Sequence, residues 1–113
     1  MLQLSDAKVK DLSFEPAGSK ATGTTYSNSQ DVEKYRELIV FADMDTVTTT
    51  FNITLQVSPD ESWWIDHDDF TQITAAGDYE KRFTNFSRYV RLKMIDVGAS
   101  VIGSNGIIGT AKT

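Results

Sequence analysis

Residues 51–57 alternate strictly between apolar and polar side chains, and this stretch constrains the fold more than any other part of the chain. A period of two residues is typical of a β-strand with one face on a hydrophobic core and the other in water. Two strand-like neighbours, residues 35–44 and 86–95, can cover this strand on either side. The apolar positions of the alternating stretch are Phe51, Ile53, Leu55 and Val57.

The two neighbouring stretches carry related patterns. Residues 35–45 place Ile39 and Phe41 on one face of the expected strand, opposite the face that carries Leu38, Val40, Ala42 and Met44. We therefore expect the middle of this strand to be covered on both sides. In residues 88–95, apolar and polar positions alternate again, which predicts another half-buried strand.

Turn signals separate the expected strands at regular intervals. Proline presets the backbone of a turn and aspartate can bond its own backbone, so residues 58–62, with Pro59 and Asp60, predict a turn. Asn105-Gly106, between two apolar pairs, predicts a hairpin. No stretch has convincing helical spacing. These features favour an all-β chain that forms a single antiparallel β-sandwich or jelly-roll-like domain.

The N-terminal part has a different composition. Residues 1–31 are expected to form an extended N-terminal arm or long loop with one short strand, from Val9 to Phe14. Residues 17–31 are small and polar, so they cannot bury enough apolar surface to order themselves. They are expected to lie on this domain or on a neighbour, or to form a plain surface loop. Residues 32–113 are expected to form the sandwich, with a loose C-terminal end.

Charge and composition exclude several classes of function. A net charge of −5 argues against nucleic-acid binding, which depends on lysine and arginine contacts to phosphates. The chain has no cysteine, no signal-peptide pattern at its first residues and no apolar run long enough to cross a membrane. Residues 60–80 carry only acidic charges and residues 81–93 only basic ones. These two stretches are expected to face each other within the fold, to pair between subunits, or to form two solvated faces.

The sequence gives little support for catalysis or for a metal site. The single histidine, His67, lies among acids and without a nucleophile-elbow pattern, so no enzymatic role and no cofactor are expected. Three acids, and also the pair Asp43 and Asp45, are weak candidates for binding a hard cation such as calcium. The run lacks the alternation with glycine that calcium loops show. The three acids are Asp66, Asp68 and Asp69.

Four aromatic residues form a candidate platform for sugar rings, although large aromatic side chains more often fill cores. Adjacent residues of a strand point to opposite faces, so one of Trp63 and Trp64 is expected in the core and the other nearer the surface. The four residues are Trp63, Trp64, Tyr79 and Tyr89.

Several stretches together resemble the small β-sandwich proteins found in the virion modules of tailed bacteriophages. They lie between residues 33 and 97 and include Tyr35–Phe41, Leu55–Trp64, Phe70–Gly77 and Asn85–Leu92. The resemblance implies a structural part of the virion that assembles in the host cytoplasm, either a head decoration (cement) protein on the capsid lattice or a neck or tail component. It also implies the major capsid protein or other virion proteins as partners, and self-association at symmetry axes.

The candidate interaction residues are those of the aromatic pair, the acidic run and the basic strand. They are Trp63, Trp64, Asp66, Asp68, Asp69, Arg88, Arg91 and Lys93. A second resemblance implies another function, because Arg88-Tyr89-Val90-Arg91-Leu92 is similar to the last strand of discoidin-like and carbohydrate-binding sandwiches. In that case Trp63 or Trp64 stacks on a cell-surface glycan, for example from a tail or tail fibre.

Overall fold

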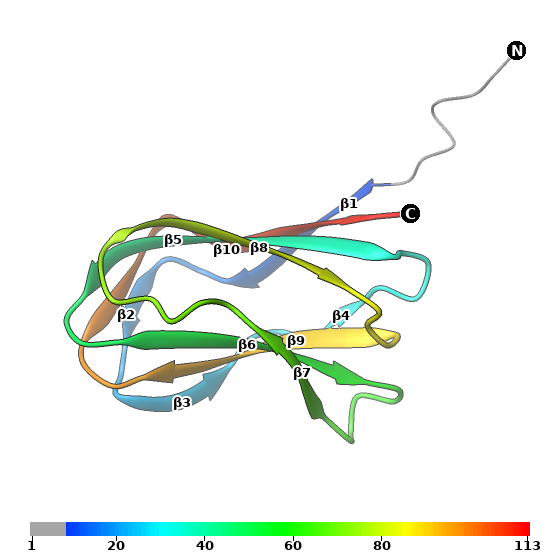
Figure 1. Cartoon of the computed structure of the whole chain (residues 1–113), viewed down its shortest axis with the longest axis horizontal. Helices are drawn as coiled ribbons and strands as arrows, with labels where there is room; N and C mark the ends of the chain where they lie inside the picture. The colour runs from blue at the N-terminus through cyan, green and yellow to red at the C-terminus, as the bar shows by residue number, and fades with distance from the viewer. Residues whose placement is uncertain (1–8) are drawn as a thin grey trace, which may run out of the picture.

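Two antiparallel β-sheets pack face to face in the computed structural model, which describes residues 9–113 (Figure 1). The all-β sandwich predicted from the sequence is therefore confirmed. Sheet A contains β1 (Val9–Glu15), β2 (Gly18–Lys20), β5 (Glu37–Val47), β8 (Gly77–Thr84) and β10 (Ser100–Lys112). Sheet B contains β3 (Gly23–Tyr26), β4 (Gln30–Asp31), β6 (Phe51–Ser58), β7 (Ile65–Asp69) and β9 (Tyr89–Asp96). Within the described range, no helix is long and apolar enough to cross a membrane.

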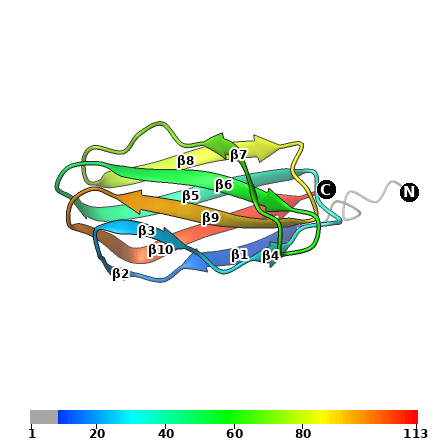
Figure 2. The ribbon, with the colours of Figure 1, turned by 90° about the horizontal axis from the view of Figure 1, so that it is seen from below.

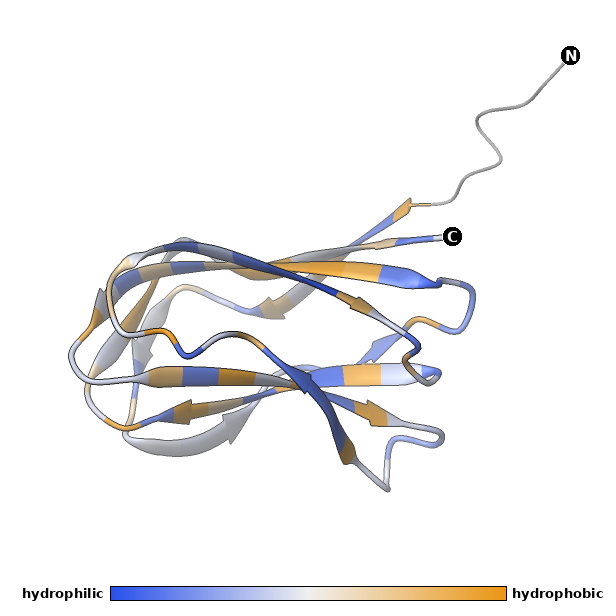
Figure 3. Ribbon diagram, in the orientation of Figure 1, coloured by the Kyte–Doolittle hydropathy of each residue, from blue (hydrophilic) through white to orange (hydrophobic). Residues whose placement is uncertain are grey.

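The alternating stretch forms β6, as predicted, and β6 lies between β9 and β7 in sheet B. Figure 3 shows apolar and polar residues alternating along β6. The strand predicted within residues 88–95 forms β9 and is the direct neighbour of β6, whereas β5 lies in the opposite sheet. The apolar faces of the two sheets meet in a core that includes Leu38, Val40, Met44, Phe51, Ile53, Leu55, Val90, Leu92 and Met94.

The outer face of β5 differs from the expectation. Covering on both sides was predicted for Ile39 and Phe41, but the side chain of Phe41 is 39% exposed. Ile108, which lies opposite Phe41 on β10, is 41% exposed. The prediction was wrong because covering the outer face of β5 would need a third layer of structure. Apolar residues on both faces of one strand do not supply such a layer. The described residues form two layers only, and the outer face of sheet A keeps an apolar patch.

The N-terminal segment takes part in both sheets from Val9 onward. The strand predicted from Val9 to Phe14 is confirmed as β1, which pairs with β10. Of the residues predicted as an arm or long loop, β2 also pairs with β10, and β3 and β4 pair with β9. The segment therefore lies on its own domain and crosses from sheet A to sheet B (Figure 1), and Figure 2 shows β3 beside β9. The first eight residues of the predicted arm lie outside the described residues.

The hairpin predicted at Asn105-Gly106 does not form. β10 runs through this point, and its pairing with β5 shifts between Ile102 and Ile107, so that residues 103–106 form an irregular bulge. The carboxylate of Asp43 accepts hydrogen bonds at 3.0 Å from the backbone and the side-chain amide of Asn105. Gly106 has a φ of 72°, a conformation that glycine adopts easily. The C-terminal end that was expected to be loose belongs to β10 as far as Lys112.

Side-chain contacts tie the two sheets together at both open sides of the sandwich. On one side, Gln30 donates to the backbone carbonyl of Ser13 at 3.0 Å, and Lys10 donates to the carbonyl of Asp31 at 3.2 Å. On the other side, His67 Nε2 of β7 lies 2.7 Å from the carbonyl oxygen of Thr84 at the end of β8. These contacts engage one backbone carbonyl of β1 and one of β8, the two outermost strands of sheet A.

Candidate interaction surface

The two tryptophans follow a rigid turn between β6 and β7. The carboxylate of Asp60 accepts hydrogen bonds from the backbone N–H groups of Ser62 (2.9 Å) and Trp63 (3.0 Å), and these bonds lower the pKa of that carboxyl. The hydroxyl oxygen of Ser58 accepts the N–H of Glu61 at 2.8 Å. The turn predicted at residues 58–62 is therefore confirmed, and its own side chains stabilise it.

Neither tryptophan enters the core, so the expectation that one would be buried there was wrong. Trp63 is 64% exposed in the turn, and Ile65, two residues later at the start of β7, is 46% exposed. Trp64 is half-buried on the outer face of sheet B, and its indole N–H donates to the carbonyl oxygen of Glu61 at 3.1 Å. The alternation argument failed because both residues belong to the turn and precede the first residue of β7.

Arg91 lies between two aromatic rings on the outer face of sheet B. Its guanidinium carbon is 4.2 Å from the ring centroid of Tyr26 and 4.3 Å from that of Trp64. Its Nε donates to Oε1 of Gln56 at 2.8 Å, from the position opposite on the neighbouring strand. Each cation–π contact is worth about 0.5–1 kcal/mol at an exposed site. We call the arrangement of Tyr26, Trp64 and Arg91 the arginine clamp.

A network of polar side chains supports the clamp. Lys93 donates to the carboxylate of Asp66 at 2.8 Å, and the side-chain amide of Gln56 donates to the other oxygen of the same carboxylate at 2.8 Å. Next to them, Thr54 donates to Asp69 at 2.7 Å. Thr54 and Gln56, two polar positions of β6 that were predicted to face water, are therefore buried under the side chains of β7 and β9. Gln56 is held from both sides and fixes the orientation of Arg91.

The pKa of Asp66 provides a test of this network. The ammonium group of Lys93 and the amide of Gln56 lower the pKa of this carboxyl below its usual 3.8. Because the pKa is lower in the folded protein than in the unfolded chain, the stabilisation is fully present above the unfolded value and is lost as the pH falls through the folded value. We expect Lys93→Met to raise the pKa of Asp66 towards 3.8 in an NMR titration of side-chain carboxyls. The low pKa of Asp31 should not change, because its partner is Arg88. An unchanged Asp66 would mean that the ion pair does not form in solution.

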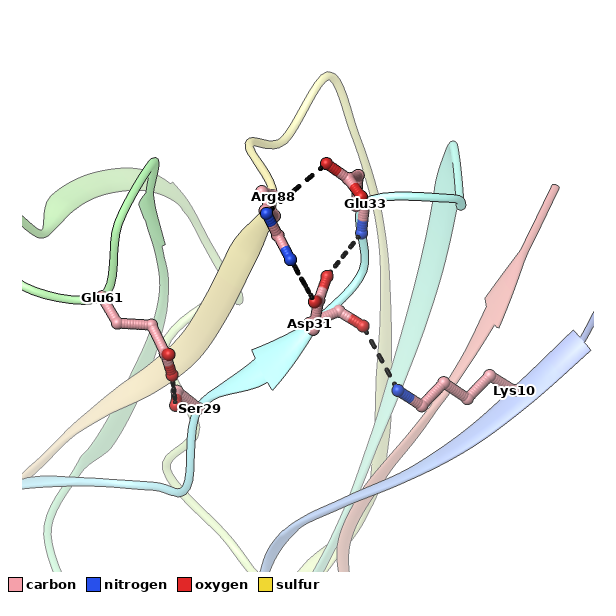
Figure 4. A network of polar contacts seen from close by, with 6 residues as sticks. All are labelled: Lys10, Ser29, Asp31, Glu33, Glu61 and Arg88. Carbon is pink, nitrogen blue, oxygen red and sulfur yellow. Dashed lines mark hydrogen bonds and ion pairs between the residues drawn. The ribbon is translucent and has the colours of Figure 1, made fainter.

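The other predicted interaction residues lie elsewhere. Asp68 pairs with Lys81 of β8 at 3.6 Å and so joins the two sheets. Arg88 binds Asp31 at 3.1 Å and Glu33 at 3.7 Å, in a network separate from the contacts of the clamp (Figure 4). Its hydrogen bond is the main cause of the lowered pKa of Asp31.

The acidic and basic stretches meet within the fold at two points. These are the pairs Asp66–Lys93 and Asp68–Lys81. Pairing of the same stretches between subunits stays a prediction.

The weak metal candidates do not converge. Asp66, Asp68 and Asp69 bind Lys93, Lys81 and Thr54 respectively. Asp43 and Asp45 both lie on β5, and Asp43 binds Asn105. Across residues 9–113, no group of three or more histidine, cysteine, aspartate or glutamate side chains is placed to hold a metal ion.

Tyr26 is the clamp residue that the sequence did not identify. It follows a run of small polar residues and carries no local pattern. Only the pairing of β3 with β9, which places Tyr26 opposite Lys93, brings its ring next to Arg91. The aromatic platform predicted from four residues is also different, because Tyr79 packs against the core and Tyr89 contacts Arg88.

Comparison with known proteins identifies the fold but no family. No family model matches the chain, and no curated protein matches its sequence. Among solved structures, the chain is similar to the SPBc2 prophage-derived protein YomS, with a TM-score of 0.65 and 15% identity over 100% of this chain and 98% of that one. It is similar to the PBSX exported protein XepA, with a TM-score of 0.61 and 14% identity, over 93% of this chain but 36% of XepA. Murine APRIL at pH 8.0 gives a TM-score of 0.59 and 13% identity over 95% and 99% of the two chains. Such low identities show a shared β-sandwich fold alone.

Proposed function

We propose that this chain is a non-enzymatic structural protein of a bacteriophage virion, a head decoration protein that docks on the capsid lattice and contacts the major capsid protein. One of the similar structures, YomS, is a prophage-derived protein, and the match covers 100% of this chain and 98% of YomS. Within residues 9–113, the single histidine contributes to the contact between β7 and β8. The chemistry that the surface offers is recognition of another protein through exposed aromatic and charged side chains.

The observation that carries the proposal is the exposed tip of the β6–β7 turn. Trp63 is a large apolar side chain left 64% exposed on a turn whose backbone is fixed by Asp60. Tryptophan is over-represented among the residues that contribute most of the binding free energy of protein interfaces. A tip whose backbone is already ordered also loses little conformational entropy on binding. Trp63 together with Ile65 is therefore the contact that we assign to the capsid.

Removal of the Trp63 side chain tests this assignment. We expect Trp63→Ala to weaken co-sedimentation with empty capsids by about thirtyfold or more, which corresponds to the 2 kcal/mol of a strong interface residue. The free energy of unfolding should change by less than about 0.5 kcal/mol, since the side chain makes few contacts in the isolated domain. The matched control is Val97→Ala, which removes another exposed apolar side chain, in the β9–β10 turn.

Two results would contradict the proposal. The wild-type protein could fail to sediment with capsids at low ionic strength, or Trp63→Ala and Val97→Ala could bind equally well. Mass spectrometry of purified virions adds an independent check, because a decoration protein must be present in them.

A second candidate function is carbohydrate binding by an adhesion module. It is favoured by the exposure of two aromatic side chains, Trp63 and Tyr26, the latter 50% exposed. Aromatic faces of this kind can stack on sugar rings. Retention of the protein on a polysaccharide column, lost in Trp63→Ala, together with no binding to capsids, would favour this function over capsid decoration.

A further inference from the structure

The outer face of sheet A carries an apolar patch with an acidic rim. Phe41 and Ile108, both about two-fifths exposed, lie next to each other on β5 and β10. They are among the residues that line an open hollow of about 510 Å³. Its other lining residues include Asp43, Asp78, Tyr79 and Glu80. We call this feature the acidic hollow.

The carboxylates of the acidic hollow have no cationic partner among the described residues. Asp43 and Asp78 lie directly opposite each other on β5 and β8, an arrangement in which like charges are destabilising. Asp43 accepts hydrogen bonds only from the uncharged Asn105, and no ion pair between described residues includes Asp78 or Glu80. A cation placed over this rim would relieve the repulsion, and the exposed ring of Phe41 would gain apolar contact.

Arg91 of the arginine clamp has the complementary property. Its neighbour Lys93 is paired with Asp66, but no ion pair between described residues includes Arg91. Only its Nε is engaged, by Gln56, and the aromatic rings of Tyr26 and Trp64 hold the guanidinium on both sides. A guanidinium held in this way has lost most of its rotamer freedom, and its remaining N–H groups can bind a carboxylate in bidentate geometry.

The unpaired charges favour one of the three possible face-to-face contacts between two copies of the chain. Contact between two sheet A faces would bring one set of unpaired acids against the other, and contact between two sheet B faces would bring one Arg91 against another. Contact of sheet B on sheet A brings an unpaired arginine to unpaired carboxylates, with aromatic rings beside Phe41 and Ile108. We propose that a second copy of this chain docks its arginine clamp into the acidic hollow of the first copy.

This contact joins two different surfaces, so it is heterologous. The two surfaces lie on opposite faces of the sandwich, as the two layers in Figure 1 show. Successive copies therefore stack in one direction, with a free clamp at one end of the stack and a free hollow at the other. The inference does not depend on capsid binding, because the purified chain alone is sufficient for the test.

Sedimentation of the purified chain over a range of concentrations tests the contact. We expect wild-type protein to self-associate, and to do so less at high ionic strength. Arg91→Gln, whose amide can still donate to Gln56, should weaken association by about tenfold or more. The double variant Asp78→Lys, Glu80→Lys should weaken it equally. When the two variants are mixed, the intact hollow of the first can bind the intact clamp of the second, and a complex limited to two chains should form.

Matched controls separate this contact from a general effect of charge. Arg82→Gln removes an exposed arginine from sheet A, and Asp11→Lys reverses an exposed acid on β1, and neither should change the association. Thermal unfolding of each variant checks that the fold is kept. The proposal is overturned if the wild-type chain remains a monomer at every concentration, or if either site variant associates as the wild type does. It is also overturned if a mixture of the two variants forms no complex of two chains.

Discussion

Replacement of Phe14 by alanine is expected to lower the free energy of unfolding by about 3–5 kcal/mol, the usual cost of removing a fully buried phenylalanine side chain. Phe14 lies on β1, has no exposed surface and packs so closely on Gly109 that a Cβ there would lie 2.9 Å from its ring. Urea or thermal denaturation followed by circular dichroism measures the loss. This would make the first described strand an integral part of the core.

The adjacent exposed residue provides the control. Ser13→Ala alters a side chain on the outer face of the same strand and is expected to change stability by less than about 0.5 kcal/mol. If Phe14→Ala were tolerated as well as Ser13→Ala, the N-terminal segment would not belong to the folded domain in solution, and pairing of β1 with β10 would have to be abandoned.

Removal of the carboxylate of Asp96 is the second change with a large expected effect. Asp96 is 3% exposed and accepts hydrogen bonds from the N–H groups of Gly98 (3.1 Å) and Ser100 (3.1 Å) and from the hydroxyl of Ser100 (2.9 Å). Asp96→Ala leaves these donors without an acceptor at the turn between β9 and β10. We expect a loss of about 2–4 kcal/mol, since each unsatisfied buried donor costs about 1–3 kcal/mol.

Two further variants define the cause of this loss. Asp96→Asn keeps one carbonyl oxygen in place and should lose less stability than Asp96→Ala. Asp45→Ala removes an exposed acid of β5 and should have little effect. Equal losses in Asp96→Ala and Asp45→Ala in denaturant titrations would show that net charge, and not the turn, determines the difference.

The parts of the fold that the sequence predicts are those where one strand carries enough information by itself. The alternation in β6 and β9 identified these two strands. β2 and β3 could not be found, because residues 17–26 are small and polar, and their strand conformation comes from hydrogen bonds to β10 and β9. The hairpin predicted at Asn105-Gly106 was wrong for a related reason. The same dipeptide can form a bulge within a strand, and here the carboxylate of Asp43 on the neighbouring strand binds Asn105.

The candidate site was predicted residue by residue but not as an arrangement. Trp64, Asp66, Arg91 and Lys93 were identified from the sequence as interaction residues, and the structure brings them together on sheet B. The sequence could not indicate that Tyr26 completes the clamp, or that Asp68 and Arg88 belong to other contacts, because these facts depend on strand register and on which strands lie at the edges.

The pairing of β1 with β10 has a consequence for how the chain reaches its native state. These strands are at opposite ends of the described sequence, and β10 is the central partner of β1, β2 and β5. Until β10 has been synthesised, sheet A therefore lacks the strand with which β1, β2 and β5 pair. Folding of this domain should be comparatively slow, because the pairing of β1 with β10 joins segments that are far apart in the sequence.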